Sequence, residues 1–344
     1  MNGKGKADSA TVEQIAKTCG VSAVTVSRAL RADAPVAAGT RRLILQAAEA
    51  AGYQPRVRMG RPRRAARVER PCIEVILGAR LHSEFYSVLL TAIERELSVR
   101  SHDCVIRTAT GGFGEFVRLC EVLRDSPGIP TMAVGYLPLQ QLRTLLEVRP
   151  QTLLVDHTGD PRLTMPYSSI GFDNTEAARM MVRHLLERGR RRILLLKGFA
   201  EHYFSREVEQ GYREAMAQAG LPADPELIRE TDYTAENAVD TLNAALDAGT
   251  KFDAVFTNDE IAAAVLHTLR KCGLRVPEDV AVGGCDGLPF GQYTMPPLTT
   301  VLLDHVRLGR MAVEHILEPE RGTSAPRRLR LLPLLEVRES TGTI

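Results

Sequence analysis

The sequence has no apolar run long enough to cross a membrane. Of its 344 residues 44% are apolar, yet no stretch approaches the roughly 18 apolar residues of a membrane-spanning helix. The first ten residues carry charge with no apolar run behind them, which is not the pattern of a secretory signal. We therefore expect a cytoplasmic protein with no membrane partner, long enough for two or three domains.

Patterns typical of enzymes and metal proteins are also missing. The six cysteines are scattered without a C-x-x-C pair, which favours free thiols in a reducing compartment. The eight histidines form neither H-E-x-x-H nor a pair at metal-ligand spacing, and there is no G-x-S-x-G elbow. The sequence predicts no catalytic residues, no metal and no cofactor, and hence no enzyme.

Charge is distributed unevenly along the chain. The net charge is only +2, but residues 1–70 hold 14 Lys and Arg against 5 Asp and Glu, a net charge of +9. The remainder holds 30 against 37, a net charge of −7. A small basic segment on a mildly acidic body favours a polyanion as the partner of the first 70 residues. A solvated basic tail is the alternative that charge alone leaves open.

Residues 11–52 carry the signals of three short helices. Thr11 with Gln14 three residues later is a capping-box signature, and Gly20 supplies a turn. Ser22 is expected to start a second helix, with Val26 and Leu30 facing inward. Such a helix–turn–helix pair can place the start of its second helix in a DNA major groove.

The third helix of this segment is expected at TRRLILQAAEAAG. Thr40 would cap it and Gly52 would end it. The residues expected to face inward from it are Leu43, Ile44, Ala47 and Ala48.

The stretches TVEQIAKTCGVSAVTVSRAL and VAAGTRRLILQAAEAAGYQP closely resemble the head of the lactose-repressor (LacI) family of bacterial transcription regulators. The resemblance implies a small all-α helix-turn-helix DNA-binding domain at residues 10–56. It is followed by a basic linker at 57–70 and an effector-binding and dimerisation domain at 71–344.

The resemblance also implies which head residues contact operator DNA. Ala23, Val24 and Arg28 stand where the family reads base edges. A guanidinium fits guanine O6 and N7, whereas the other two side chains can offer only apolar contact. The residues expected to hydrogen-bond phosphates are Ser22, Thr25, Ser27 and Thr40.

The linker departs from the family pattern. Pro62 stands where the family carries a leucine that wedges into the minor groove, and Gly60 and Pro62 are poor helix residues. The sequence GRPR at 60–63 is similar to the core of an AT-hook. We therefore expect Arg61 and Arg63 to enter a narrow minor groove in extended form. A flexible basic linker with nonspecific attraction is the alternative.

From Cys72 onward apolar strands alternate with helices. Strand patterns such as CIEVILGA and RRILLLKG are followed by helix patterns such as EFYSVLLTAIERELSVR and SREVEQGYREAMAQAG. This alternation predicts an α/β body of two doubly wound parallel-sheet subdomains. Ligands bind at the carboxyl ends of parallel strands, so two facing sheets predict a cleft.

The body also resembles the LacI family, itself similar to periplasmic sugar-binding proteins. The matching stretches include residues 170–198, 256–287 and 334–341, and two of them, GFDNTEAAR and FGQYTMPPLTTV, look most like a gluconate-type branch. We expect a first subdomain at about 71–167 and 296–325. The second is expected at about 168–295 and 326–344.

By the same resemblance, six residues are expected in the effector cleft. Asn258 and Asp286 would hydrogen-bond effector hydroxyls. Phe85 and Tyr86 on one wall and Tyr233 on the other would stack on an apolar ring face. Val208 replaces an arginine that often grips the effector, and Arg206 is expected to substitute or to be a surface residue.

The residue Asp173, which follows a strand, is interpreted as a helix N-cap in preference to a cleft residue.

These observations predict a cytoplasmic, homodimeric transcriptional regulator that binds double-stranded operator DNA. It is expected to be a repressor controlled by a sugar, a sugar acid or a related metabolite. The alternative from another class is a solute-binding protein of the periplasmic type with no role in transcription.

Overall fold

The computed structural model describes residues 11–30, 36–51, 53, 70–78, 83–109, 111–319 and 325–342. The chain divides into two compact units, residues 1–68 and 69–344. They are called the head and the body below.

The described part of the head contains three helices, α1 (Val12–Cys19), α2 (Ala23–Ala29) and α3 (Ala38–Ala50). The capping box before α1 is present, because the Thr11 backbone N–H donates to the Gln14 side chain at 2.7 Å and the reverse bond is also made. Gly20 ends α1 with φ of +64°, a conformation that favours glycine. The side chains buried between the helices are Ile15, Ala16, Val26, Ala29, Ile44 and Ala48.

Two expectations about α3 were wrong. The helix begins at Ala38 with Ala37 as N-cap, so Thr40 lies inside its first turn and caps nothing. Leu43 is 52% exposed, because Ile44 and Ala48, one turn apart, define the buried face. Gly52 lies outside the described residues.

The first body sheet has strand order β11-β5-β4-β3-β1-β2, and every described neighbour pair in it is parallel. The strands of this sheet are buried and mainly apolar except at its two edges, as expected where helices cover both faces. They are β1 (Cys72–Leu77), β2 (Asp103–Thr108), β3 (Thr131–Val134), β4 (Leu153–Val155), β5 (Ser168–Phe172) and β11 (Arg328–Leu331).

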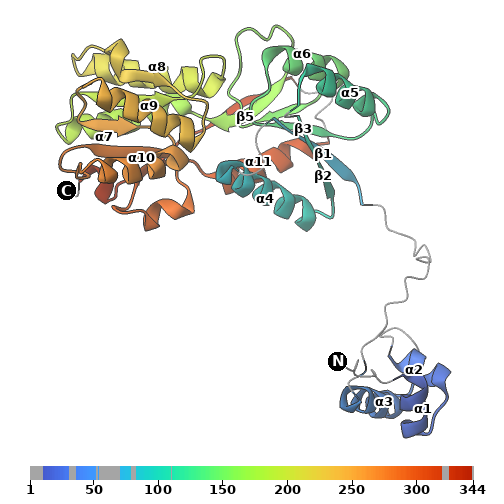
Figure 1. Cartoon of the computed structure of the whole chain (residues 1–344). Coiled ribbons are helices and arrows are strands. Elements are labelled where there is room, and N and C mark those ends of the chain that lie inside the picture. The colour runs from blue at the N-terminus through green and yellow to red at the C-terminus, as the bar shows by residue number, and fades with distance from the viewer. Residues whose placement is uncertain are drawn as a thin grey trace, which may run out of the picture. The chain divides into compact units, whose positions relative to one another are not determined.

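Helices cover both faces of this first sheet (Figure 1). One cluster of buried side chains joins α5 (Phe113–Arg124) and α6 (Leu139–Val148) to one face, and another joins α4 (Glu84–Val99) and α11 (His305–Ile316) to the other. This sheet and these helices are called the first lobe.

The second sheet has strand order β12-β10-β9-β8-β6-β7. All its described pairs are parallel except β10 with β12, which run antiparallel, so parallel pairing dominates both sheets as expected. The strands are β6 (Ile193–Lys197), β7 (Ile228–Glu230), β8 (Ala254–Phe256), β9 (Ala281–Asp286), β10 (Thr299–Leu302) and β12 (Leu334–Glu336).

This second sheet is also covered on both faces, and together with its helices it is called the second lobe. The helices α7 (Asn174–Glu187) and α8 (Tyr203–Gln218) share one buried cluster with it, and α9 (Ala235–Asp247) and α10 (Asp259–Lys271) share another. Short 3₁₀ turns are η1 (Pro225–Leu227), η2 (Pro289–Tyr293) and η3 (Glu339–Thr341).

Within the described residues the chain passes between the lobes three times, after β5, after β10 and after β11. The expected subdomain boundaries, at 167/168, 295/296 and 325/326, each lie before one of these strands and differ from the observed crossings. The reason is that each strand first completes the sheet it belongs to, and only then does the chain leave that lobe.

Candidate functional sites

The outer surface of α2 presents the side chains that the head offers to a partner. The Ser22 hydroxyl accepts a hydrogen bond from the Thr25 backbone N–H at 3.1 Å and so caps the helix as expected. Val26 and Ala29 face the core, which leaves Val24, 61% exposed, and Arg28 toward solvent. Ala23 and Ser27 are half-buried. Arg61 and Arg63 lie outside the described residues.

The body contains a cavity of about 620 Å³ between its two lobes, a volume suited to a small molecule. Side chains at or after the carboxyl ends of strands from both sheets line it. The first lobe contributes Phe85, Tyr86, Tyr136 and Asp156; the second contributes Asn174, Phe199, His202, Phe204, Tyr233, Asn258, Glu260 and Asp286, among others.

Five of the six residues expected in the cleft are brought together there. Phe85 and Tyr86, at the start of α4, meet edge to face with ring centroids 4.9 Å apart. Asn258 caps α10 by accepting from the Ile261 backbone N–H at 2.9 Å. Asp286 ends β9 and is 4% exposed.

Like Asp286, Tyr233 has an unusual backbone conformation. It is a non-glycine residue at φ of +63°, a conformation that costs free energy and that proteins keep mainly at functional sites. Its hydroxyl lies 2.6 Å from the Ser205 hydroxyl. A methyl group at Gly198 would lie 1.8 Å from its ring, so the absence of a side chain there admits the tyrosine.

Carboxyl groups dominate the charge in the cleft. Burial raises the pKa of Asp156 to about 7, although the Tyr86 hydroxyl donates to its Oδ2 at 3.1 Å. Burial likewise raises the pKa of Asp286, and the nearby carboxylates of Asp259 and Glu260 raise it further. Burial also lowers the pKa of His202 to about 3, so its imidazole is neutral at pH 7.

Several cleft residues were missed by the sequence reasoning. Tyr136 and His202 stack with ring centroids 4.4 Å apart, one from each lobe. Asn174 donates to Glu207 at 2.8 Å, and its own oxygen is buried without a partner. Position just after a β-strand is a signal that could have found Asp156, one residue after β4, and Asn174, two residues after β5, because strand ends line such clefts.

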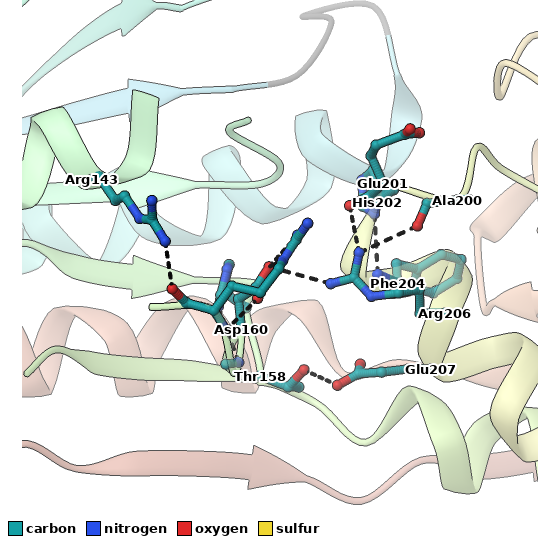
Figure 2. A network of polar contacts seen from close by, with 12 residues as sticks. Arg143, Thr158, Asp160, Ala200, Glu201, His202, Phe204, Arg206 and Glu207 are labelled. Atoms are coloured by element: carbon teal, nitrogen blue, oxygen red, sulfur yellow. Dashed lines mark hydrogen bonds and ion pairs between the residues drawn. The ribbon is translucent and has the colours of Figure 1, made fainter. Parts of the chain in front are cut away.

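Arg206 was expected in the cleft but does not line it. Its guanidinium donates to the carbonyl oxygens of Ala200 and Glu201, at 3.3 and 2.7 Å, and to Asp160 across the lobes at 3.3 Å (Figure 2). The helical period turns this position toward the first lobe. Val208, which stands at the place of the family's arginine, is buried in the core.

Further polar contacts between described residues join the lobes beside the cleft. The Thr158 hydroxyl donates to Glu207 (Figure 2), and the Tyr203 hydroxyl donates to the Asp156 carbonyl oxygen. The Glu84 backbone N–H and the Ser83 hydroxyl donate to Glu260, at 2.7 and 3.4 Å. The cleft is therefore bounded by hydrogen bonds that exist only while the lobes are together.

Asp173 is an N-cap, as interpreted. Its side chain accepts from the Glu176 backbone N–H at 3.0 Å at the start of α7.

A helix-turn-helix head and a two-lobed body with a ligand-sized cleft define a ligand-responsive DNA-binding protein. Residues 11–56 match the family model "Bacterial regulatory proteins, lacI family", and residues 182–341 match "Periplasmic binding protein-like domain". The chain is 31% identical to the HTH-type transcriptional regulator CelR of Thermobifida fusca, over 96% of this chain and 98% of the relative. The chain belongs to the LacI family and is a DNA-binding transcriptional regulator.

Other comparisons agree with this family. The HTH-type transcriptional repressor PurR of Photobacterium profundum is 26% identical over 96% of this chain and 98% of its own length. A solved complex of CelR with cellobiose superposes with a TM-score of 0.72 at 29% identity, covering 96% of this chain and 99% of that one. These relatives are regulators and not enzymes, and the matched head favours a regulator over a solute-binding protein.

No helix among the described residues is long and apolar enough to cross a membrane. In the same residues no group of three or more His, Cys, Asp or Glu side chains is placed to hold a metal ion. The six cysteines are free thiols.

Proposed function

We propose that α2 reads the operator through Ala23, Val24 and Arg28. The observation that carries this proposal is the exposure of Val24 and Arg28 on a helix whose other face is buried. An exposed guanidinium can donate two hydrogen bonds to a guanine edge, and the two apolar side chains can contact thymine methyl groups.

The hydroxyl groups around the start of α2 are proposed to bind phosphates. Ser22 and Thr25 lie with their hydroxyl oxygens 2.8 Å apart, so one hydroxyl proton serves this bond and the other is available to a phosphate oxygen. Ser27 and Thr40 are proposed for the same role. Arg61 and Arg63 are proposed to enter the minor groove at the operator centre, on the sequence argument alone.

The test begins with selection of a duplex from a random library by the full-length protein. Arg28→Ala should weaken binding of that duplex about 5- to 150-fold, corresponding to about 1–3 kcal/mol, and relax the base preference at one position. The control is Arg275→Ala, an exposed arginine of the body, which should change nothing. Failure of the unaltered protein to bind any duplex at low ionic strength would refute the proposal.

We propose that the ligand of the cleft is a sugar that controls operator affinity. Aromatic rings on both walls suit the apolar face of a pyranose, and the carboxyl and amide oxygens suit its hydroxyl groups. The cellobiose found in the CelR structure supports the same class. A thermal-shift screen of mono- and disaccharides tests this, because a bound ligand raises the melting temperature.

A gluconate-type branch, and with it a sugar-acid effector, receives less support. The charged side chains that line the described part of the cleft are Asp156, Asp232, Glu260 and Asp286. A ligand carboxylate would enter against these groups and lose its hydration without gaining a cation there. Neutral sugars are therefore favoured over sugar acids in this proposal.

We further propose a homodimeric repressor that acts in the cytoplasm. The edge strand β2 supports a dimer, because Val105 and Ile106 on its opposite faces are 38% and 43% exposed although such sheets are normally covered. The free cysteines fit a reducing compartment. Ligand-driven closure of the lobes would shift the population of DNA-competent dimers. Sedimentation tests the dimer, and a promoter–reporter assay with and without ligand tests repression and its control by the ligand.

A further inference from the structure

The cleft contains a buried hydrogen-bond acceptor without a partner. The Asn174 amide is 1% exposed, and its Nδ2 is committed to Glu207 at 2.8 Å, which fixes the amide so that its unpartnered Oδ1 is the free atom. The Tyr86 hydroxyl is committed to Asp156, and the Tyr233 hydroxyl to Ser205. A buried acceptor left unpaired costs free energy, so a ligand that supplies an N–H or O–H to Asn174 is favoured.

The charge of the cleft has one sign among the described residues that line it. Asp156 and Asp286 are buried, Glu260 is half-buried, and the histidine there is neutral. A hydroxyl group can hydrogen-bond to these oxygens but cannot compensate the negative charge that their ionisation creates. An ammonium group would satisfy both, because hydrogen bonds between a charged donor and a carboxylate are the stronger kind.

The rings around the cleft point to the same chemistry. His202, Phe199 and Tyr233 lie within 5.3–6.0 Å of one another, centroid to centroid. Tyr136 packs against the first two from the opposite lobe, at 4.4 and 5.4 Å. Faces of tyrosine and phenylalanine attract cations as well as the apolar faces of sugar rings.

We propose that the effector is an amine-bearing sugar, whose ammonium group is held by the carboxylates of Asp286, Asp156 and Glu260 and which also donates to Asn174. This inference rests on the proposed sugar-sensing function and narrows its ligand class. In this arrangement the aromatic side chains contact the sugar ring, and the acidic side chains favour a positively charged ligand over a neutral one.

Proton linkage supplies an independent readout. Burial holds the pKa of Asp156 near 7 and raises that of Asp286, so in the ligand-free cleft near neutral pH these carboxyls bind protons that an entering cation would displace. An amine sugar should therefore release protons on binding at pH 6.5. A neutral sugar should release fewer. Calorimetry in two buffers of different ionisation enthalpy measures the difference.

The experiment compares isosteric probes on the full-length protein. Cellobiose is paired with the β-1,4-linked glucosamine dimer, and glucose with glucosamine; the N-acetylated amines and gluconate complete the set. Each amine should bind at least about tenfold more tightly than its hydroxyl and N-acetyl counterparts, as the difference between charged and neutral hydrogen bonds implies. Gluconate should not bind.

Variants separate the charge from the shape of the site. Asp286→Asn should weaken binding of the amine about tenfold more than binding of the neutral sugar, because only the amine loses a charged hydrogen bond. Asp156→Asn serves if Asp286→Asn does not fold, and Asp279→Asn, a surface carboxylate paired with Arg275, is the matched control. Equal or weaker binding of the amines, equal loss of both probes in Asp286→Asn, or no binding of any amine overturns the inference.

Operator binding, measured on the same sample, distinguishes failure of the amine preference from failure of the proposed sugar-responsive regulator. Retained DNA binding and a response to cellobiose alone would overturn the amine preference and leave the sugar-responsive regulator intact. A preparation that binds no duplex and no probe would refute both.

Discussion

Removing the charge of Arg206 should loosen the contact between the lobes without destroying either lobe. Its guanidinium donates to Asp160 at 3.3 Å, whereas Arg162 on the same lobe as Asp160 holds that carboxylate with bonds of 2.6 and 2.9 Å. Asp160 therefore stays neutralised when Arg206 is lost. The large penalty of about 3–5 kcal/mol for an orphaned buried charge does not apply.

The expected magnitude follows from this geometry. Arg206 is 38% exposed, which places the pair near the upper end of solvent-screened ion pairs, about 1 kcal/mol. For a body of this size that corresponds to a melting-temperature change of about 2–4 °C. If ligand binds the closed lobes, apparent ligand affinity should fall about fivefold in Arg206→Gln.

A double-mutant cycle of Asp160→Asn with Arg206→Gln, followed by thermal unfolding, isolates the pair. Burial raises the pKa of Asp160, but Arg162 and Arg206 lower it to about 2, so this stabilisation is present above about pH 4 and is lost only as the pH falls through 2. The coupling should be constant from pH 5 to 8 and should shrink with added salt. A coupling of zero at low salt, or complete loss of ligand binding in Arg206→Gln, would refute this reasoning.

Three further predictions concern the core, the cleft and pH. Ile44→Ala should lower the free energy of unfolding of the head by about 2–5 kcal/mol, a large loss because the described helices of the head bury few side chains. Operator binding should therefore be lost, while the melting of the body, followed by calorimetry, should not change. Retained operator binding would contradict this prediction. Gly198→Ala should displace Tyr233 and destabilise the body by about 1–3 kcal/mol in chemical denaturation, whereas Gly128→Ala, where a methyl group meets nothing, should be neutral; equal effects of the two changes would contradict the packing. Because the pKa of Asp156 is raised to about 7, its protonated form adds stability at low pH that is lost as the pH rises from about 4 to 7. The melting temperature of Asp156→Asn relative to the unaltered protein should therefore rise from about pH 4 to pH 8, and a difference independent of pH would count against a buried, titrating carboxyl.

The elements of this fold were largely predictable from local pattern. Apolar runs and capping signals are properties of neighbouring residues, and both the Thr11 box and the Ser22 cap form as expected. Thr40 shows the limit of such signals, because a threonine followed by an apolar period is compatible with a helix start on either side of it. The preceding residues, unremarkable in sequence, place the N-cap three positions earlier, at Ala37.

The cleft was predictable where strand ends and family resemblance coincide, as at Asp286 and Tyr233. Of the two alternatives for Arg206, the structure favours the one outside the cleft, since a shift of two residues on a helix rotates a side chain by about 200°. Asn174 and His202 gain their roles from Glu207 and Tyr136, which are distant in sequence. The first pairing depends on how α7 packs on α8 within the second lobe and the second on how the two lobes meet, and no local pattern encodes either.

The three crossings between the lobes have a consequence for synthesis on the ribosome. The described part of the head is complete by Tyr53, whereas β11 and β12 complete the two sheets only near Glu336. At about 5–20 residues per second, translation of that interval takes roughly 15–60 s. Throughout this interval the nascent chain has a complete DNA-binding head and an incomplete ligand-binding body. Any product of premature termination in this interval could therefore bind DNA but could not respond to the metabolite.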